Sequence, residues 1–125
     1  MALEPGLAAQ VTMIVAEADT AEALRCGEVA VLATPRVINL AEEATVLALA
    51  GRLEANETSV GMRIQLDHLA PSAIGAHVTA DATLEKVEGR RLTFTVSISD
   101  DRGLIAAGKV TRVVVDRDKF LDKAR

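Results

Sequence analysis

One long segment with helical periodicity, residues 34–51, constrains the fold of this chain more than any other feature. Thr34 is a preferred N-cap residue, and Pro35 suits the first helical position, where its missing N–H is not needed. Apolar side chains then recur on one face, and the opposite face is almost as apolar. A helix that is apolar all round is buried. We therefore expect a central core helix that ends near Asn56, a residue type that tolerates the left-handed conformation.

The rest of the chain is typical of β-structure. Segment 59–69 alternates strictly between apolar and polar residues, so it is a strand with His68 on the apolar face of Ile64 and Leu66. Turn sequences at 88–90 and 100–103 separate later strands, and Gly108 indicates a bulge. The predicted strands are 10–17, 59–69, 77–87, 91–99 and 104–115.

The order of one strand, one buried helix and a four-strand antiparallel meander predicts an α+β hot-dog fold. In this architecture an antiparallel sheet of about five strands wraps around one long central helix. With 125 residues the chain is expected to form a single domain over residues 1–125. Five strands leave two exposed edges, and such an apolar helix needs more cover than one sheet provides. We therefore expect a homodimer.

Composition excludes several classes of function. Phe94 and Phe120 are the only aromatic residues and the net charge is −4, which argues against a nucleic-acid partner. No apolar stretch is long enough for a membrane span, and the N-terminus lacks the features of a leader. The single cysteine, Cys26, gives no intramolecular disulfide, so we expect a cytoplasmic protein. Metal-ligand and nucleotide-binding motifs are absent from the sequence, and we expect no metal or cofactor. The charged residues 116–125 are expected to be a solvated tail.

Three polar positions stand out against this apolar background. Glu42 and Glu43 lie side by side on the buried helix, so at least one carboxylate is expected to face the interior. His68 faces the helix from the neighbouring strand, where an imidazole and a carboxylate can satisfy each other. Thr34 stands at the helix start, where free N–H groups favour a developing oxyanion. The structural alternatives are a helix cap, a core histidine and carboxylates at a dimer seam.

Three motifs carry a family resemblance. They are residues 32–42, residues 59–71 and the Val-Glu-Gly-Arg-Arg-Leu run at 87–92. Together they make the chain, over roughly residues 8–121, resemble the hot-dog acyl-CoA thioesterases related to fluoroacetyl-CoA thioesterase. The resemblance implies a catalytic set of Thr34, Glu42 and His68. It also implies that the Gly61 backbone N–H binds the thioester carbonyl.

The resemblance is incomplete at positions near this set. Leu32 stands where the family commonly has an aromatic residue, and Ala41 stands where it often has methionine. The last strand also lacks a histidine that the family commonly carries between Gly108 and Arg112. We therefore do not expect selectivity for a fluorinated acyl group.

The sequence thus predicts hydrolysis of an acyl-CoA or acyl-carrier thioester to free acid and thiol. The general base would be His68 and its orienting partner Glu42, while Thr34 would be the nucleophile or would position water. Thr34 and Glu42 are about 12 Å apart along a straight helix, so one imidazole can contact both only if the first helical turn bends away or the partner subunit supplies one of the two. The site is therefore expected at a subunit interface. A hot-dog hydratase or dehydratase and a non-catalytic acyl-CoA-binding module are the alternatives.

Overall fold

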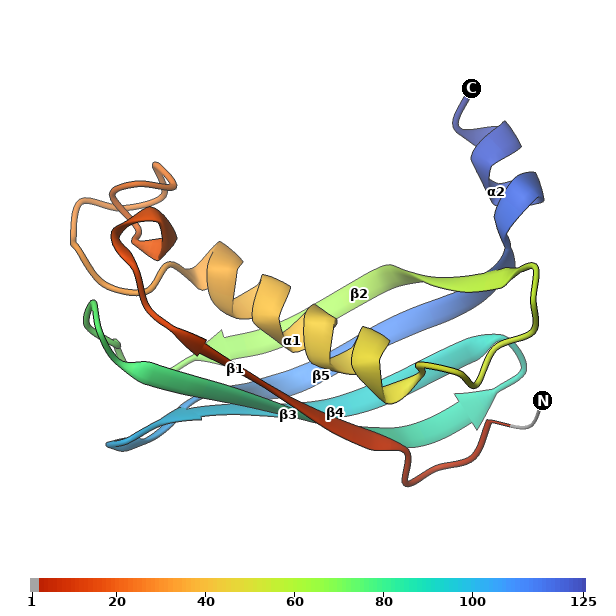
Figure 1. Cartoon of the computed structure of the whole chain (residues 1–125), viewed down its shortest axis with the longest axis horizontal. Coiled ribbons are helices and arrows are strands. Elements are labelled where there is room, and N and C mark those ends of the chain that lie inside the picture. Colours follow the sequence, from red (N-terminus) through yellow and green to blue (C-terminus); the bar gives the residue numbers. More distant parts are fainter. Residues whose placement is uncertain (1–2) are drawn as a thin grey trace.

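A five-stranded antiparallel sheet curves around one long helix in the computed structural model, which describes residues 3–125 (Figure 1). The sheet order is β1-β3-β4-β5-β2, so β1 and β2 are its edges. The predicted α+β architecture is confirmed. The elements are β1 (Ala8–Ile14), a 3-10 turn (Glu17–Asp19), α1 (Thr34–Ala48), β2 (Glu57–His68), β3 (His77–Glu88), β4 (Arg91–Asp100), β5 (Gly103–Asp116) and α2 (Arg117–Lys123).

Helix α1 begins and ends differently from the sequence prediction. Its N-cap is Ala33, and Thr34 is already helical, so the expected capping role of Thr34 is wrong. Pro35 is therefore the second helical residue and not the first, but it still lies in the first turn. The helix ends at Ala48, and Gly51, with a φ of 75°, takes the left-handed conformation that was expected of Asn56.

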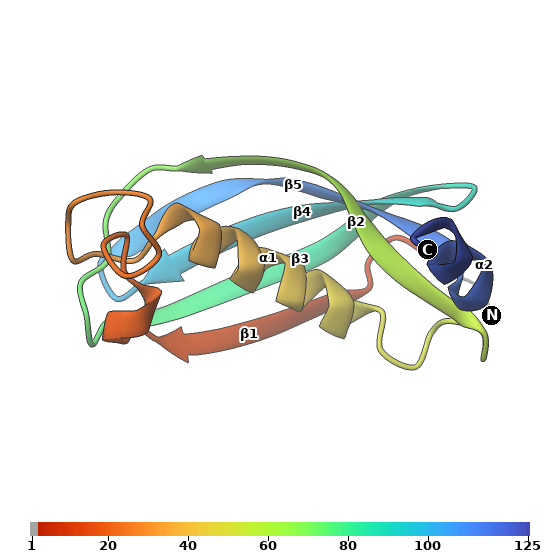
Figure 2. The ribbon, with the colours of Figure 1, turned by 90° about the horizontal axis from the view of Figure 1, so that it is seen from above.

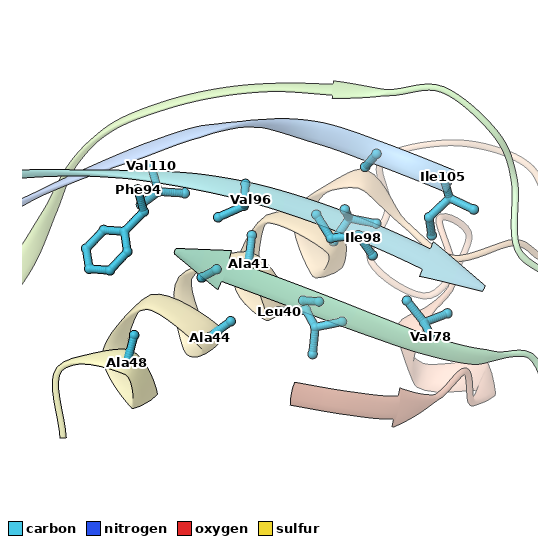
Figure 3. Packing of buried hydrophobic residues seen from close by; sticks show 14 of the residues in the cluster. Leu40, Ala41, Ala44, Ala48, Val78, Phe94, Val96, Ile98, Ile105 and Val110 are labelled. Atoms are coloured by element: carbon cyan, nitrogen blue, oxygen red, sulfur yellow. The ribbon is translucent and has the colours of Figure 1, made fainter. Parts of the chain in front are cut away.

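The core lies between the helix and the inner face of the sheet (Figure 3). Leu40, Ala41 and Ala44 of α1 contact a layer of sheet residues that includes Phe94 and Val96, and all five are at most 1% exposed. The opposite face of α1 is open, because Val46 and Leu47 are 51% and 50% exposed. The expectation of a wholly buried helix is therefore wrong for the single chain. The sheet covers one side only, as the view from above also shows (Figure 2).

A bulge in β2 overturns the predicted strict alternation of that strand. Gly61 pairs with Arg112 and Arg63 pairs with Thr111, so Met62 is the extra residue. Beyond it, Ile64 and His68 pair with residues of β5 that are fully buried, Val110 and Ala106. The inner face thus changes from odd to even positions. His68 shares that face with Ile64 and Leu66 as predicted, but not with Val60 and Met62, as the pattern had implied.

Two further predictions about β5 are corrected. Gly108 is not a bulge: it pairs in register with Leu66, and a β-carbon there would collide with the backbone of Gln65. Close approach of two strands therefore explains this glycine. The C-terminal residues are not a simple tail, because Asp116 accepts a hydrogen bond from Lys119 N and caps α2. This short helix extends away from the sheet (Figure 1).

Candidate active site

The first turn of α1 and the end of β2 bring Thr34 and His68 together. Thr34 Oγ1 and His68 Nδ1 share a hydrogen bond of 2.8 Å. The threonine side chain is available for it because Ala33, not Thr34, is the helix cap. His68 Nε2 is buried and has no hydrogen-bond partner within residues 3–125. A hydroxyl thus lies beside a base, as nucleophilic catalysis requires. Thr34 and His68 are two of the three polar residues that the sequence analysis singled out.

A pocket of about 360 Å³ opens beside this pair. Thr34 and His68 supply its polar groups, and its wall is mainly apolar. Cys26, which is exposed, also lines it. A mainly apolar cavity with a few convergent polar groups is the usual form of a small-molecule site. The apolar lining consists chiefly of Val29, Val31, Leu32, Pro35, Leu69, Ala70 and Pro71.

Glu42 lies farther along α1 and is bound to Arg112 of β5. The distance from Arg112 Nη1 to Glu42 Oε2 is 3.0 Å, and their side chains are 7% and 35% exposed. Arg112 also donates to Ser59, through Nε to Oγ at 2.9 Å and through Nη2 to the carbonyl oxygen at 3.1 Å. Burial lowers the pKa of the Arg112 guanidinium, and the charge and hydrogen bond of Glu42 oppose that decrease. Glu42 therefore faces a buried cation, while Glu43 is exposed.

Arg112 is the polar partner that the sequence analysis missed. A signal for it was present, because Arg112 occupies an inward position of β5 between the buried residues Val110 and Val114. A buried arginine needs a carboxylate as its partner. The sequence analysis had instead paired the Glu42 carboxylate with His68. The alternation of β5, taken together with the helical periodicity of α1, would have indicated the pair of Arg112 and Glu42.

Gly61 lies directly beneath the Glu42 carboxylate. A β-carbon at this position would collide with Glu42 Oε2 and approach Arg112 Nη1 to 3.8 Å. The bulge at Met62 is what places Gly61 on the inner face together with His68. The structure therefore brings Gly61, Glu42 and Arg112 into one group.

The four predicted site residues thus form two groups in the single chain. Thr34 and His68 are at one end of α1, and Glu42 and Gly61 are about two helical turns away, since eight residues of helix span about 12 Å. The predicted contact between His68 and Glu42 is not made within the chain: His68 binds Thr34, and Glu42 binds Arg112. Among residues 3–125 no cluster of three or more metal-ligating side chains occurs, and no helix is long and apolar enough to cross a membrane.

Comparisons with known proteins agree with this fold and identify the family. The chain matches the family model for fluoroacetyl-CoA-specific thioesterase over residues 15–118. It is 41% identical over 95 residues to the fluoroacetyl-CoA thioesterase of Streptantibioticus cattleyicolor, covering 76% of this chain and 68% of that protein. A solved structure of a fluoroacetyl-CoA thioesterase superposes with a TM-score of 0.94 at 33% identity, covering 100% of this chain and 97% of that one. A thioesterase superfamily member from Thermus thermophilus gives 0.90 at 27% identity, covering 98% and 90%.

A sheet of five strands around a central helix, with a hydroxyl–imidazole pair beside an apolar pocket, defines a hot-dog thioesterase, and the solved relatives have this fold. Its reaction is the hydrolysis of acyl-CoA thioesters. Within that class the chain belongs to the fluoroacetyl-CoA-specific thioesterase family. The resemblance drawn from the sequence motifs is confirmed.

Proposed function

We propose that Thr34, His68, Glu42 and Gly61 hydrolyse an acyl-CoA thioester in a site completed by two copies of the chain. The observation that carries this proposal is the hydrogen bond of 2.8 Å between Thr34 Oγ1 and His68 Nδ1. A nucleophile and base within hydrogen-bonding distance are the minimum that acyl transfer to water requires. The reaction needs no cofactor apart from the CoA of the substrate.

His68 acts as the general base. Its Nδ1 accepts the Thr34 proton as Oγ1 attacks the thioester carbonyl, and the CoA thiolate leaves when the tetrahedral intermediate collapses. His68 passes its proton to the departing sulfur, which is released as the CoA thiol. The neutral imidazole then takes a proton from the water that attacks the acyl-threonine ester, and it returns this proton to Thr34 Oγ1 as the acid leaves. In the alternative reaction pathway Thr34 only positions the water that His68 deprotonates. Both pathways release one carboxylic acid and one thiol, and both require the Thr34 hydroxyl.

Glu42 reaches the reaction from the partner subunit. Within one chain it lies about 12 Å along α1 from Thr34, too far for a shared contact. A two-fold axis reverses the direction of the second helix, and it thereby brings Glu42 of one copy toward Thr34 and His68 of the other. Arg112 holds the carboxylate in place through their ion pair, so that the carboxylate can orient His68 or an attacking water.

The Gly61 N–H is assigned to the thioester carbonyl. The carbonyl oxygen gains negative charge in the transition state, and a fixed backbone donor stabilises it there. A thioester carbonyl oxygen bound at Gly61 would also lie near the Glu42 carboxylate. In this proposal the attacking water approaches from the side of that carboxylate. The absence of a β-carbon at Gly61 leaves room for the Glu42 carboxylate.

The second copy pairs through the β2 edge. The outer edge of β2 is free in the single chain, and Met62 on it is 46% exposed. Helix α1 packs mainly on β1 and β3, which leaves Ile64 and Leu66 of β2 only partly covered. Val46 and Leu47 on the open helix face need cover as well. Antiparallel pairing of two β2 strands covers these surfaces and continues the sheet across both subunits.

A cytoplasmic location belongs to the same proposal, because acyl-CoA substrates are formed and used there.

We propose that the site does not select for a fluorinated acyl group. The relative in Streptantibioticus cattleyicolor is called a fluoroacetyl-CoA thioesterase. The pocket of this chain is lined by short aliphatic side chains, including Leu32 and Val31, and by no aromatic residue among those described. Such a wall offers general apolar contact rather than specific recognition of one fluorine atom.

The decisive experiment measures thiol release from a series of acyl-CoAs that includes acetyl-, fluoroacetyl- and longer straight-chain esters. Thiol release in the parent protein and its loss in His68→Ala are expected. A change in enoyl-CoA absorbance without thiol release would indicate a hydratase. Thermal stabilisation by acyl-CoA with neither signal would indicate a binding module and overturn the proposal.

A further inference from the structure

The pocket beside the hydroxyl–imidazole pair is walled on one side by the loop of residues 20–33, which lies beside the start of α1 (Figure 1). Backbone hydrogen bonds hold this loop. Ala21 N donates to the Val31 carbonyl at 2.9 Å, and Leu32 N donates to the Ser72 carbonyl at 2.9 Å, which joins the loop to the segment after β2. The size and lining of the pocket are therefore set by a fixed wall.

We propose that this pocket takes an uncharged hydrocarbon acyl group of about six to eight carbons, so that the substrates are medium-chain acyl-CoAs. The inference rests on the proposed function, since it names the acyl group whose thioester Thr34 and His68 cleave. Three features of the pocket carry it: its volume, the chemistry of its lining, and the exposure of two apolar side chains on its wall.

The volume of the pocket is larger than a two-carbon group can fill. It is about 360 Å³. A water molecule occupies about 30 Å³ of liquid and a methylene group is of similar size, so an acetyl group leaves most of the pocket empty. A chain of about six to eight carbons fills about half to two thirds of it and leaves room for the thioester.

The lining suits hydrocarbon and no other part of the substrate. Among residues 3–125, the side chains that line the pocket carry no fixed charge, and beyond Thr34 and His68 their only heteroatom is the Cys26 thiol. The pantetheine arm of CoA has two amides and a hydroxyl, which would lose hydrogen bonds to water against this wall. A carboxylate at the far end of the acyl group would lose still more. The hydrocarbon chain of the acyl group has nothing of this kind to lose.

Two large apolar side chains of the wall are exposed. Leu69, which directly follows His68, is 62% exposed, and Val29 of the loop is 57% exposed. Apolar side chains that remain exposed in a concave site are typical of a binding groove for an apolar ligand. An acyl chain in the pocket covers apolar surface on both segments.

Small residues keep the loop side of the pocket open. A β-carbon at Gly27 would lie only 3.1 Å from the Ala21 β-carbon, so the loop has no internal room for a larger side chain there. Cys26, beside Gly27, is exposed and lines the pocket. The apolar surface that a large side chain at Cys26 can cover is the pocket itself, where it would shorten the space for an acyl chain.

The first test measures kcat/KM of the parent protein for straight-chain acyl-CoAs from acetyl to dodecanoyl. Burial of each methylene is expected to raise kcat/KM about fourfold until the chain reaches about six to eight carbons. Hexanedioyl-CoA, which ends in a carboxylate, should fall at least about tenfold below hexanoyl-CoA. A maximum at acetyl-CoA, or equal values for hexanoyl- and hexanedioyl-CoA, would overturn the inference.

The second test compares Cys26→Phe with Ala23→Phe. The control adds the same ring to the same loop at an exposed residue that does not line the pocket. The ratio of kcat/KM for octanoyl-CoA over acetyl-CoA should fall at least about tenfold in Cys26→Phe and stay at the parent value in Ala23→Phe. An equal ratio in the two variants would contradict the assignment of the acyl chain to this pocket.

The third test separates the acyl pocket from the proposed hydrolysis. Cys26 is the only cysteine of the chain, so its alkylation by iodoacetamide reports whether the pocket is occupied. Octyl-CoA, a thioether that cannot be hydrolysed, should slow the alkylation at least about tenfold, whereas ethyl-CoA at the same concentration should not. Protection by octyl-CoA in a protein that hydrolyses no thioester would support the pocket and overturn the proposed function. Hydrolysis of acyl-CoA with no protection by octyl-CoA would overturn the pocket and leave the hydrolase intact.

Discussion

Glu42 Oε2 lies so close to the backbone of Gly61 that a β-carbon at Gly61 would overlap it. The two residues come from α1 and β2, and the bulge at Met62 sets their approach. The carboxylate is held from the other side by Arg112. The contact joins the group assigned to orient the base or water with the backbone donor assigned to the thioester carbonyl. Any side chain at Gly61 must therefore displace one of them.

We expect Gly61→Ala to reduce turnover by about tenfold or more with only a modest loss of stability. The new methyl group meets the end of a flexible side chain, which can move aside, but Glu42 then leaves its position. Gly108→Ala is the matched comparison, because its methyl group would meet the backbone of Gln65 and Leu66. That variant should unfold more easily, by about 2 kcal/mol or more. Thermal unfolding and thiol release for both variants test the contrast, which fails if both lose stability equally.

Thr34→Ala should lower kcat by at least about 10²-fold, and Thr34→Ser should retain much of the activity. The helix cap is Ala33 and the Thr34 side chain is exposed, so the free energy of unfolding should change by about 0.5 kcal/mol or less. Near-normal turnover in Thr34→Ala would remove the hydroxyl from the mechanism.

Mass spectrometry distinguishes the two reaction sequences open to Thr34. If Thr34 is the nucleophile, rapid quenching of a single turnover should reveal a protein heavier by one acyl group, absent in Thr34→Ala. If Thr34 positions water, no acylated protein should form at any time during turnover, although the hydroxyl is still required.

Hybrid dimers test whether Glu42 acts on the partner's histidine. His68→Ala should lower kcat by about 10²–10⁴-fold, the usual contribution of a positioned base. A hybrid of one His68→Ala subunit and one Glu42→Ala subunit should recover about half of the parent activity, because one of its two sites contains both native groups. If both groups belonged to one chain, each site of the hybrid would lack one of them and no recovery would occur. Sedimentation must show a dimer at the assay concentration, and an active monomer would contradict the shared site.

Asp100 should make stability depend on acid pH. Burial raises the pKa of its carboxyl, but hydrogen bonds from Ser72 Oγ at 2.7 Å and Arg102 N at 2.8 Å lower it further, to a net value below the ordinary 3.8. A pKa lower in the folded state gives stability that is present above about pH 4 and lost as the pH falls through the folded value. Asp100→Asn should therefore melt below the parent at neutral pH, and the difference should narrow toward about pH 2. A constant difference in melting temperature across this range would contradict the assignment.

The arrangement of strands and helix was predictable from the sequence because it follows from periodicity. Alternation located β2 and β4, and the apolar content of 34–51 indicated the core helix. Periodicity does not reveal where a strand changes which of its residues, odd or even, face inward. The bulge at Met62 shifts the inner face of β2 by one residue, and nothing in the alternating pattern marks it. Alternation alone would therefore have separated Gly61 from His68.

Side-chain pairing was harder to predict than position. Thr34, Glu42 and His68 were chosen for their chemistry, yet the contacts are Thr34 with His68 and Glu42 with Arg112. The choice of partner depends on where β5 passes beneath α1, which is a long-range property of the sheet. The capping of α2 by Asp116 was locally encoded, but the mixed charges of residues 116–125 concealed it.

The bulge at Met62 also determines which changes of length β2 can accept. His68 follows Gly61 by seven residues, an odd number. The two residues therefore share a face of the sheet only because the bulge takes Met62 out of the alternation. A related chain that lacks Met62 would have a spacing of six and would keep both positions inward in a regular strand. A one-residue gap at this point of an alignment therefore preserves the site. One extra residue would turn His68 outward if the single bulge were kept, and would leave it inward only if the bulge were lost or a second one formed.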